Sequence, residues 1–378
     1  MSTLAIPEDP FVVREGRARS LGLDFIEKWA DLAECSLEGN AFLSPHFVLP
    51  ALHHLPGQQG KDPVVLAVEY AGEERLLGLG VFETRRASRL LPLRHLTSWE
   101  CTHSFFSGLL LDQELAFPTA VALFRWLRQQ GDRWRGLAFD GRSADSELSS
   151  VLDDAAGATG IVWYEDGWWD RAAVWADRIP EEGAEKAYSR SHRRHVKDRW
   201  RRLRSLGDAV FRLDRCQDGP SDALETFLQL EAMGWKGEQG TALLSHPGHE
   251  RFAREMAAGF AASGSLLFNE LLIDGEAAGS VLCLRSGDTL FSFKSGFDPR
   301  FAKGSPGAMV SLTLLDGMDE LGGVRLIDSC TVPGSWKESI WPWRRRLTTG
   351  VFPTTASGRA AVRTSLALKK VKRRFSGD

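Results

Sequence analysis

The feature that most constrains the fold is a run of three strand patterns with short turns between them, enclosed by helix patterns. Asp274-Gly275 joins the first two strands, and residues 286–288 (Ser-Gly-Asp) join the second to the third. Both sequences favour tight hairpin turns. Such a meander between helices predicts an α/β fold with mixed sheets. The three predicted strands are 266–273, 277–284 and 289–297, and the flanking helices are 249–263 and 308–321.

The rest of the chain predicts a second unit of the same class. With 378 residues the chain is long enough for two domains. The polar stretch 177–183, which contains Pro and Gly, is the predicted linker. We therefore predict an N-terminal domain over 1–178, a C-terminal domain over 184–356 and a basic C-terminal helix or tail over 357–378. Further helices are expected over 21–35, 115–130, 145–155, 185–206 and 222–233, and further strands over 63–70, 75–82, 136–140, 209–213, 324–329 and 346–352, with short strands near 161 and 173.

Composition and motifs exclude several classes of protein. A net charge of −3 gives no whole-chain reason to expect nucleic acid. Five scattered cysteines without a C-x-x-C pair argue against a disulfide scaffold or a zinc ribbon, and we expect no metal. The motifs of kinases, zinc hydrolases, serine hydrolases and Rossmann dehydrogenases are absent. No apolar run reaches the roughly 18 residues of a membrane span, and residues 1–10 lack signal-peptide features, so a cytoplasmic protein is expected.

The loop after the third strand has the composition of an anion-binding turn. Residues 300–308 read RFAKGSPGA. Ser305 is a suitable helix N-cap, and Pro306 suits the first helical position. The two glycines allow close approach of a ligand, the Arg and Lys add positive charge, and the amides at a helix start bind phosphate. A capped helix after a turn is the simpler interpretation, and a pyrophosphate cradle is the functional one.

In this context the C-terminal half resembles the GNAT superfamily of N-acyltransferases. Within it, the chain is most similar to the CelD-like acetyltransferases, a two-domain family related to the Fem-type aminoacyltransferases. The usual GNAT loop, [Q/R]-x-x-G-x-[G/A], differs here by one extra spacing and by Pro306. The matching segments, in the order of the family, are 230–237 (LEAMGWKG), Gly240-Thr241, Phe293-Lys294, Asp298, 305–307 (SPG), 328–330 (DSC), Pro333 and Trp341.

The resemblance implies tandem GNAT-like domains, the second binding acyl-CoA and the first shaping the acceptor site. Acetyl-CoA or another acyl-CoA would be the co-substrate. An amine of a small molecule or sugar precursor would attack the thioester directly, so positioning does much of the work. A backbone amide on the strand around 291–294 would polarise the thioester carbonyl. The residues predicted to bind the cofactor are Arg300, Lys303, Gly304, Ser305, Gly307 and Ala308.

The implied reaction needs a group that takes the proton of the acceptor amine. Glu231 is the first candidate, because it ends an apolar helical run next to Trp235 and Lys236, where burial would raise its pKa. A salt-bridged helix-end Glu is the alternative. Asp328 is the second candidate, at the end of a strand, with a turn in which it bonds nearby amides as the alternative. Lys294 lies mid-strand and either pairs with one of these carboxylates, contacts substrate or occupies the polar face.

Two further residues, Cys330 and Tyr188, are of types that take part in acyl transfer. Cys330 suggests an acyl-cysteine intermediate, but every histidine precedes it and a free Cys more often packs in a core. Many GNAT enzymes protonate the leaving thiolate with a tyrosine, and the second half contains only Tyr188, so that role is not assigned. The residues predicted to contact substrate are Trp235, Lys236, Phe293, Ser329 and Cys330.

The helix pattern over 190–204 carries eight Lys or Arg against one Asp. It is either a solvated face or a binding surface for an anionic substrate, CoA phosphates or RNA. Residues 369–374 form a second basic cluster of the kind that is solubilising or weakly attracted to membranes. The 13 tryptophans predict mainly packing, with some lining an acceptor groove. An N-acetyltransferase is our first prediction; a Fem-type enzyme using aminoacyl-tRNA and a non-catalytic GNAT-fold subunit are the alternatives.

Overall fold

The structure is a computed structural model that describes residues 10–72, 75–216 and 219–376. At 221, 235, 319 and 370–376 it describes the backbone alone. Residues 1–9, on which the expected absence of a signal peptide rests, lie outside the described part, and so do the side chains of the basic cluster after Lys369.

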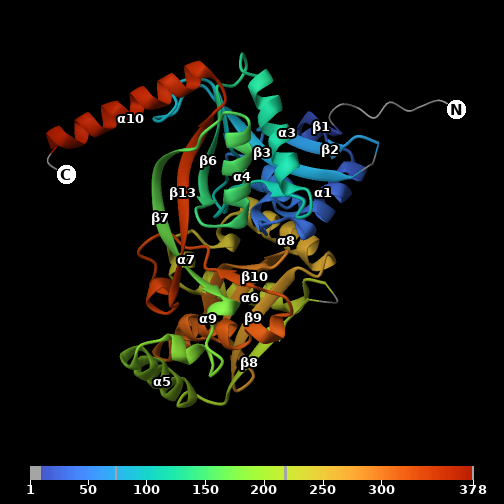
Figure 1. Cartoon of the computed structure of the whole chain (residues 1–378). Helices are drawn as coiled ribbons and strands as arrows, with labels where there is room; N and C mark the ends of the chain where they lie inside the picture. Colours follow the sequence, from blue (N-terminus) through green and yellow to red (C-terminus); the bar gives the residue numbers. More distant parts are fainter. Residues whose placement is uncertain (1–9, 73–74, 217–218, 377–378) are drawn as a thin grey trace. The chain divides into compact units, whose positions relative to one another are not determined.

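The chain forms two compact units (Figure 1). Unit 1 comprises 1–45, 62–169 and 346–378, and unit 2 comprises 46–61 and 170–345. The chain passes between them on two long strands, β7 (Tyr164–Trp175) and β13 (Trp343–Pro353). The bounds of the two units differ from the predicted domain bounds, because 46–61 belongs to unit 2 and 346–378 to unit 1. The single strand β7 also replaces the two short strands expected near 161 and 173. The predicted linker belongs to unit 2, where it includes part of the 3-10 helix η3 (Ala176–Arg178).

Unit 1 is a mixed sheet with the strand order β1-β2-β3-β4-β6-β13-β7, and β5 pairs with β3. Within the described residues, β4 and β6 pair in parallel, and Leu96 lies opposite Leu137. A core of aliphatic and aromatic side chains, including Phe82, Phe124 and Phe139, fills the space between sheet and helices. The elements are β1 (Phe11–Arg17), η1 (Ala18–Ser20), α1 (Leu23–Cys35), η2 (Ala41–Leu43), β2 (Val64–Tyr70), β3 (Leu76–Arg85), β4 (His95–Ser98), β5 (Leu110–Leu111), α3 (Ala116–Gln129), β6 (Gly136–Ser143), α4 (Glu147–Ala158) and α10 (Ala356–Ser376).

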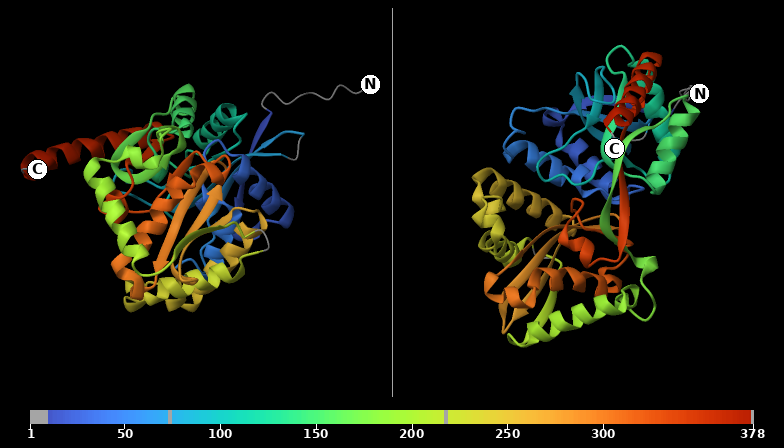
Figure 2. Two further views of the ribbon diagram at one scale, coloured as in Figure 1. Left: turned by 90° about the horizontal axis from the view of Figure 1, so that it is seen from below. Right: turned by 90° about the vertical axis from the view of Figure 1, so that its left-hand side faces the viewer.

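Unit 2 repeats this plan with the strand order β7-β12-β11-β10-β9-β8. Figure 2 shows its sheet between α8 on one side and α9 on the other, with α5 beyond α9. The second unit also has its own core, which includes Val281, Met309 and Trp341. The elements are η4 (Ala184–Ala187), α5 (Arg190–Arg204), β8 (Ala209–Asp214), α6 (Ser221–Met233), α7 (Trp235–Glu238), η5 (Leu243–Ser245), α8 (Pro247–Ala262), β9 (Leu266–Ile273), β10 (Glu276–Ser286), β11 (Thr289–Phe297), η6 (Pro299–Gly304), α9 (Pro306–Asp316), η7 (Met318–Leu321), β12 (Leu326–Asp328) and η8 (Trp336–Ser339).

The predicted α/β class is confirmed, and both units share an order of a strand, one or more helices, three successive antiparallel strands (followed by β5 in unit 1), a helix and a strand. The meander is present as β9, β10 and β11, and the first and third of these have the predicted bounds. The turn between β9 and β10 takes left-handed conformations at Asp274 (φ 50°) and Gly275 (φ 82°), as a two-residue hairpin requires. The tandem organisation inferred from the resemblance therefore has a structural counterpart.

Two α-helices of unit 2, the short α7 and the longer α2 (Pro45–His54), were not predicted. The α2 helix carries Pro50 in its interior, a residue that normally disfavours a helix. It packs through Phe47, whose ring centroid lies 5.3 Å from that of Phe252 on α8 and 6.1 Å from that of Phe293 on β11. The aromatic contacts stabilise a helix that local propensity disfavours.

Candidate active site

The two parallel strands of unit 2 part at the carboxyl end of the short strand β12, while β11 runs on. β11 and β12 pair only over three residues, ending where Phe291 faces Asp328. β11 then continues to Phe297, and its pairing with β10 is interrupted by a β-bulge at Phe293, the residue left between the Leu282–Lys294 and Cys283–Ser292 pairs. Beyond Phe291 the two strands therefore no longer pair with each other, and the bulge bends β11 locally. This is the place where an α/β sheet receives ligands.

The predicted phosphate loop lies next to this opening, with one correction. Pro306 is the first residue of α9, as predicted. Ser305, however, adopts a left-handed conformation (φ 54°, ψ 52°) and its hydroxyl does not cap α9. Ser305 is also the C-cap of η6, and its left-handed backbone differs from the extended conformation of a side-chain N-cap. Its carbonyl accepts from the N–H groups of Ala308 (3.0 Å) and Met309 (3.1 Å), as in any helix start. Gly307, the second residue of α9, is left with an N–H that no carbonyl within the helix can reach.

A cavity of about 380 Å³ opens at this helix start. Three of the six predicted cofactor residues line it, together with the outer end of β11 and with η8. Two cationic side chains, Arg199 of α5 and Lys236 of α7, face the same space. We call it the Ser305 cavity; its lining residues are Arg199, Lys236, Ser295, Phe297, Ala302, Ser305, Pro306, Gly307, Ala308, Trp336, Ser339 and Ile340.

The other three predicted cofactor residues lie outside this lining. Arg300 is exposed and donates to Asp298 (2.7 Å) and Glu276 (3.0 Å). Lys303 is exposed as well. Gly304 is buried, and a Cβ there would lie 2.6 Å from the Leu203 side chain, so this glycine serves the packing of α5 against η6. Their role in binding the cofactor stays a prediction.

Glu231 is buried in a charged cluster next to the cavity. Its Oε1 accepts from the Lys236 ammonium at 3.0 Å, and its Oε2 accepts from the N–H of Leu243 at 2.9 Å. The Lys294 ammonium lies 4.0 Å from Oε1, which realises the pairing that the sequence offered for this lysine. Lys236 also donates to the Ser295 carbonyl at 3.0 Å and lines the cavity. The α6 backbone can approach β11 this closely because residue 296 is a glycine. A Cβ at this position would lie only 2.5 Å from the backbone nitrogen of Glu231.

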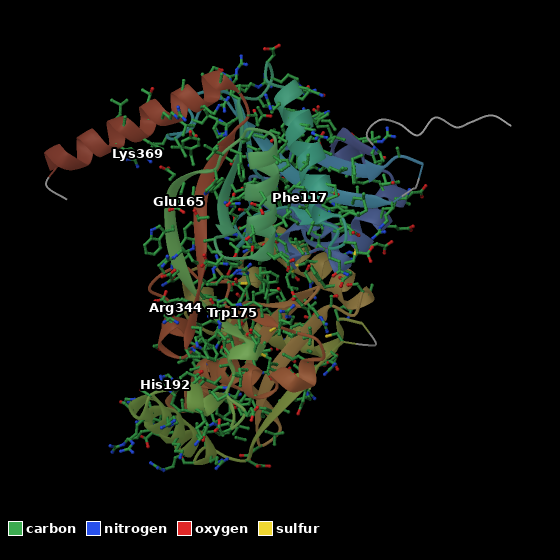
Figure 3. The ribbon with its side chains drawn as sticks, viewed as in Figure 1. Phe117, Glu165, Trp175, His192, Arg344 and Lys369 are labelled. Atoms are coloured by element: carbon green, nitrogen blue, oxygen red, sulfur yellow. The ribbon has the colours of Figure 1, made fainter. Side chains whose placement is uncertain are left out.

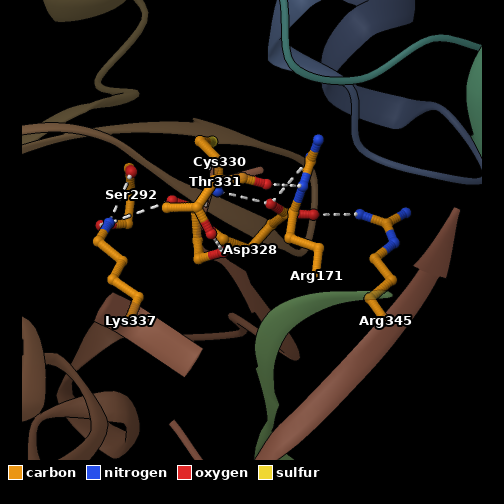
Figure 4. A network of polar contacts seen from close by, with 8 residues as sticks. Arg171, Ser292, Asp328, Cys330, Thr331, Lys337 and Arg345 are labelled. Atoms are coloured by element: carbon orange, nitrogen blue, oxygen red, sulfur yellow. Dashed lines mark hydrogen bonds and ion pairs between the residues drawn. The ribbon is translucent and has the colours of Figure 1, made fainter. Parts of the chain in front are cut away.

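Asp328 lies in a different cluster, which Figure 4 shows in detail. Its two carboxylate oxygens accept from the guanidinium groups of Arg171 (3.3 Å) and Arg345 (3.0 Å). The Cys330 N–H also donates to it at 2.8 Å, which is the turn considered as the alternative to catalysis. Burial raises the pKa of Asp328, but the two guanidinium groups and this N–H more than offset it, so that pKa lies below its usual value. Asp328 does not line the Ser305 cavity.

Lys337 of η8 is a buried cation that sequence analysis missed. Its ammonium bridges the parted strands: it donates to the Ser292 hydroxyl (2.8 Å), the Ser292 carbonyl (3.2 Å) and the Ser329 carbonyl (3.1 Å). Burial lowers the pKa of Lys337 to about 8. Because Trp336 and Ser339 on either side of it line the Ser305 cavity, this lysine anchors one wall of that cavity.

The residues predicted to contact substrate are divided between the cavity and the core. Lys236 lines the cavity, whereas Phe293, Ser329 and Cys330 are buried. Burial and the adjacent Asp328 raise the pKa of the Cys330 thiol well above its usual value, so it lacks the thiolate that an acyl-cysteine mechanism requires. The side chain of Trp235 lies outside the described part of the structure.

Arg199 was missed as an individual residue, although the sequence offered a signal for it. CoA phosphates were one of the ligands considered for the basic helix, and Arg199 is the residue of α5 that lines the Ser305 cavity. Among the described residues no group of His, Cys, Asp and Glu is arranged to hold a metal ion. None of the described helices has the length and apolar character needed to cross a membrane.

Comparison with known proteins agrees with this geometry. Residues 190–338 match the family model of the acetyltransferase (GNAT) domain. No curated protein matches the chain. FemX has a similar structure at 11% identity, with 89% of this chain and 96% of FemX covered and a TM-score of 0.55. The C-terminal domain of a proposed lysylphosphatidylglycerol synthetase from Agrobacterium fabrum also has a similar structure, at 13% identity. The likeness covers 93% of this chain and 95% of that domain, with a TM-score of 0.53.

A conserved protein of unknown function from Bacteroides thetaiotaomicron is also similar, at 12% identity, with 90% of this chain and 100% of that chain covered and a TM-score of 0.52. At these identities the likenesses show the fold alone. The family model begins with α5 and ends within η8, so it covers the lining of the Ser305 cavity except Ser339 and Ile340. Residues 190–338 of unit 2 are therefore similar to a GNAT acetyltransferase domain, and the protein is an acyltransferase.

Proposed function

We propose that the protein transfers an acyl group, most simply acetyl, from acyl-CoA to an amine of a small molecule or sugar precursor. The observation that carries this proposal is the Ser305 cavity, where a helix start and two cations meet beside the parted strands. A diphosphate there would accept from the Gly307 N–H and pair with Arg199 and Lys236. The pantetheine arm would follow β11 past Ser295, and no metal takes part.

The reaction is direct transfer. The acceptor amine attacks the thioester carbonyl, a C–N bond forms, the C–S bond breaks and CoA leaves as the thiolate. Glu231 remains our first candidate for the base that takes the amine proton. Its Oε1 accepts from the Lys236 ammonium, which lines the cavity, so an acceptor amine reaches this oxygen by replacing Lys236 as the donor. Lys294 would then keep the site charge-balanced from 4.0 Å away.

Calorimetry with acetyl-CoA tests the donor. We expect micromolar binding to the wild-type protein and binding about tenfold weaker in Gly307→Ala, because the added methyl group shields the N–H that meets the diphosphate. A Cβ at Gly307 would lie 3.5 Å from Phe297, an ordinary contact, so the variant should fold. Gly317→Ala at the other end of α9, also with its nearest contact at 3.5 Å, is the matched control. Equal affinities in both variants would contradict this binding mode.

An aminoacyl-tRNA donor is the second candidate, favoured by the exposed cations of α5. Arg190, Arg194 and Arg202 are among them. Binding of a polyanion through such a surface weakens steeply as salt increases. Salt-sensitive tRNA binding without acetyl-CoA binding would select this alternative, and binding of neither would leave a non-catalytic subunit.

The acceptor is then identified by incubating pools of amines with isotopically labelled acetyl-CoA and screening for labelled products by mass spectrometry. Our proposal predicts a labelled amide and release of free CoA in equal amounts. CoA release without any labelled amine would indicate thioester hydrolysis and contradict amine transfer.

A further inference from the structure

Unit 2 contains a second, larger cavity along the other side of α5. One stripe of this helix faces it, with members three or four residues apart as on a single helical face. The stripe alternates cations with apolar side chains. The cavity has a volume of about 710 Å³, within the range of pockets for drug-sized ligands. We call it the Trp200 cavity; its α5 residues are Arg193, Val196, Lys197, Trp200, Arg201, Arg204 and Ser205.

The opposite walls of the Trp200 cavity come from α9 and from the segment before α5. Leu312 and Leu315 of α9 contribute an apolar surface, and both are nearly fully buried. Asp316 and Glu185 are the acidic residues in the lining, against four cations on α5. The space is thus apolar inside and positive along one side.

Two polar atoms near this wall are buried and have no hydrogen-bond partner. The phenol of Tyr188, which lines the cavity, is one, and Nε2 of His192 is the other. The two rings are stacked, with centroids 4.3 Å apart and planes 11° from parallel; His192 is labelled on α5 in Figure 3. Buried polar atoms in native proteins are almost always hydrogen-bonded. Within the described residues, this wall thus leaves two buried polar atoms unsatisfied.

We propose that the Trp200 cavity binds a single-chain amphiphilic anion, an alkyl carboxylate or alkyl phosphate. The apolar chain lies against Trp200, Leu312 and Leu315. The anionic head pairs with Arg193 and Lys197, at the end of the α5 stripe that is closest to Tyr188 in sequence. The sign of the rim selects an anion over a cation, and the apolar walls select a long chain over a short one.

This site is separate from the Ser305 cavity, and it does not depend on the proposed function. The two linings have no residue in common. α5 forms a wall of both cavities, because Arg199 faces one and Trp200 the other. A ligand in the Trp200 cavity would thus rest on the same helix that packs against Gly304 in the loop before α9.

The first test is calorimetry of the full chain with four probes below their micelle concentrations. Dodecanoate and dodecyl phosphate are expected to bind, and the stronger of the two identifies the head group. Dodecyltrimethylammonium, with the same chain and the opposite charge, and butanoate, with the same head and a short chain, should each bind at least about tenfold more weakly. Absence of binding by both long anions, or equal binding of the long cation, overturns the proposal.

A pair of matched charge reversals locates the site. Arg193→Glu with Lys197→Glu should weaken the long anion about tenfold or more. Arg190→Glu with Arg194→Glu has the same spacing on the same helix but lies outside the lining of both cavities, and it should leave the affinity within about twofold. Equal losses in the two variants would place the anion elsewhere. Should the first variant misfold, the four probes on the wild-type chain still decide.

Competition separates this inference from the proposed function. The long anion should bind with the same affinity in the presence of saturating acetyl-CoA, since the cavities share no lining residue. Displacement by acetyl-CoA would overturn the existence of a second site. Binding of the long anion to a protein that fails to bind acetyl-CoA would refute the proposed donor and leave the Trp200 site standing.

Discussion

Two buried carboxylates in unit 2 have similar burial but different surroundings. Asp328 is held by two arginines that are themselves buried, with side chains 4% (Arg171) and 3% (Arg345) exposed. Glu231 is held by Lys236, whose side chain is 21% exposed and lines the Ser305 cavity. The first cluster is closed, whereas the second opens onto a cavity through one flexible, cationic side chain.

The difference teaches that burial of a carboxylate does not identify a catalytic base. Glu231 lies in the last turn of α6 and Asp328 ends β12, and these positions made both residues candidates. What separates them is the access of a substrate to the carboxylate. Two buried guanidinium groups, each donating to one oxygen of Asp328, fix the geometry and charge of that carboxylate. A lysine ammonium, by contrast, can be replaced by another amine. On this comparison Asp328 stabilises the fold and Glu231 is the better candidate for chemistry.

The largest expected effect comes from breaking the closed cluster. Asp328→Asn leaves two buried guanidinium groups without a counter-charge, which typically costs about 3–5 kcal/mol of folding stability. Denaturant-induced unfolding measures this loss. Glu270→Gln is the control, because Glu270 is equally buried but its partner Arg212 is 56% exposed and can be solvated. A loss in the control as large as that in Asp328→Asn would show that the closed cluster is not special.

Lys337, which anchors the strands next to the closed cluster, should give stability a dependence on pH. Its pKa is about 8 in the folded protein against an ordinary value of 10.5, so between these values the unfolded chain binds more protons. Stability should therefore rise as pH increases from about 8 to 10.5, by up to about 3 kcal/mol.

Lys337→Met isolates this contribution, because cysteines and tyrosines also titrate in the same interval. The difference in free energy of unfolding between wild type and variant should increase with pH through this window. The variant also leaves the carbonyls of Ser292 and Ser329 without their donor, so it should be less stable at every pH. A difference that stays constant from pH 8 to 10.5 would contradict the proposed titration.

The open cluster should respond in catalysis rather than in folding. Glu231→Gln removes the proposed base, and the rate of acyl transfer should fall about 100-fold or more. Glu225→Gln on the same helix, 50% exposed and paired with Arg254, is the control and should keep the wild-type rate. A full rate across pH in Glu231→Gln would show that Glu231 is not the base.

Local sequence patterns predicted the meander and the helix start because turns and helix ends depend on neighbouring residues. Asp274-Gly275 specifies its hairpin wherever the strands lie, and Pro306 begins α9 as predicted. The prediction that the Ser305 hydroxyl caps α9 was wrong, and the spacing of residues could not have shown why. The loop before α9 is itself a 3-10 helix, and Ser305, which follows it, has a left-handed conformation.

The closed cluster was beyond sequence reasoning because it joins residues that are distant in the chain. Arg171 and Asp328 are 157 positions apart, and Lys337 bonds Ser292, 45 positions away. No periodicity or motif reports such pairs. The α2 helix was missed for the opposite reason, since its local signal, an interior Pro50, points away from a helix and only packing of Phe47 stabilises it.

The smallest expected effect concerns the cation that completes the open site. Arg199 lines the Ser305 cavity, whereas Arg202 on the same helix is exposed and lines neither cavity. If the cavity binds the diphosphate of acyl-CoA, Arg199→Ala should weaken acetyl-CoA binding about threefold to tenfold at low salt, and the difference should shrink as salt increases. Arg202→Ala should lose only the long-range attraction common to all charges on α5. Equal, salt-sensitive losses in the two variants would mean that the basic helix attracts the ligand as a whole, and the distinction between open and closed clusters would then rest on Glu231 alone.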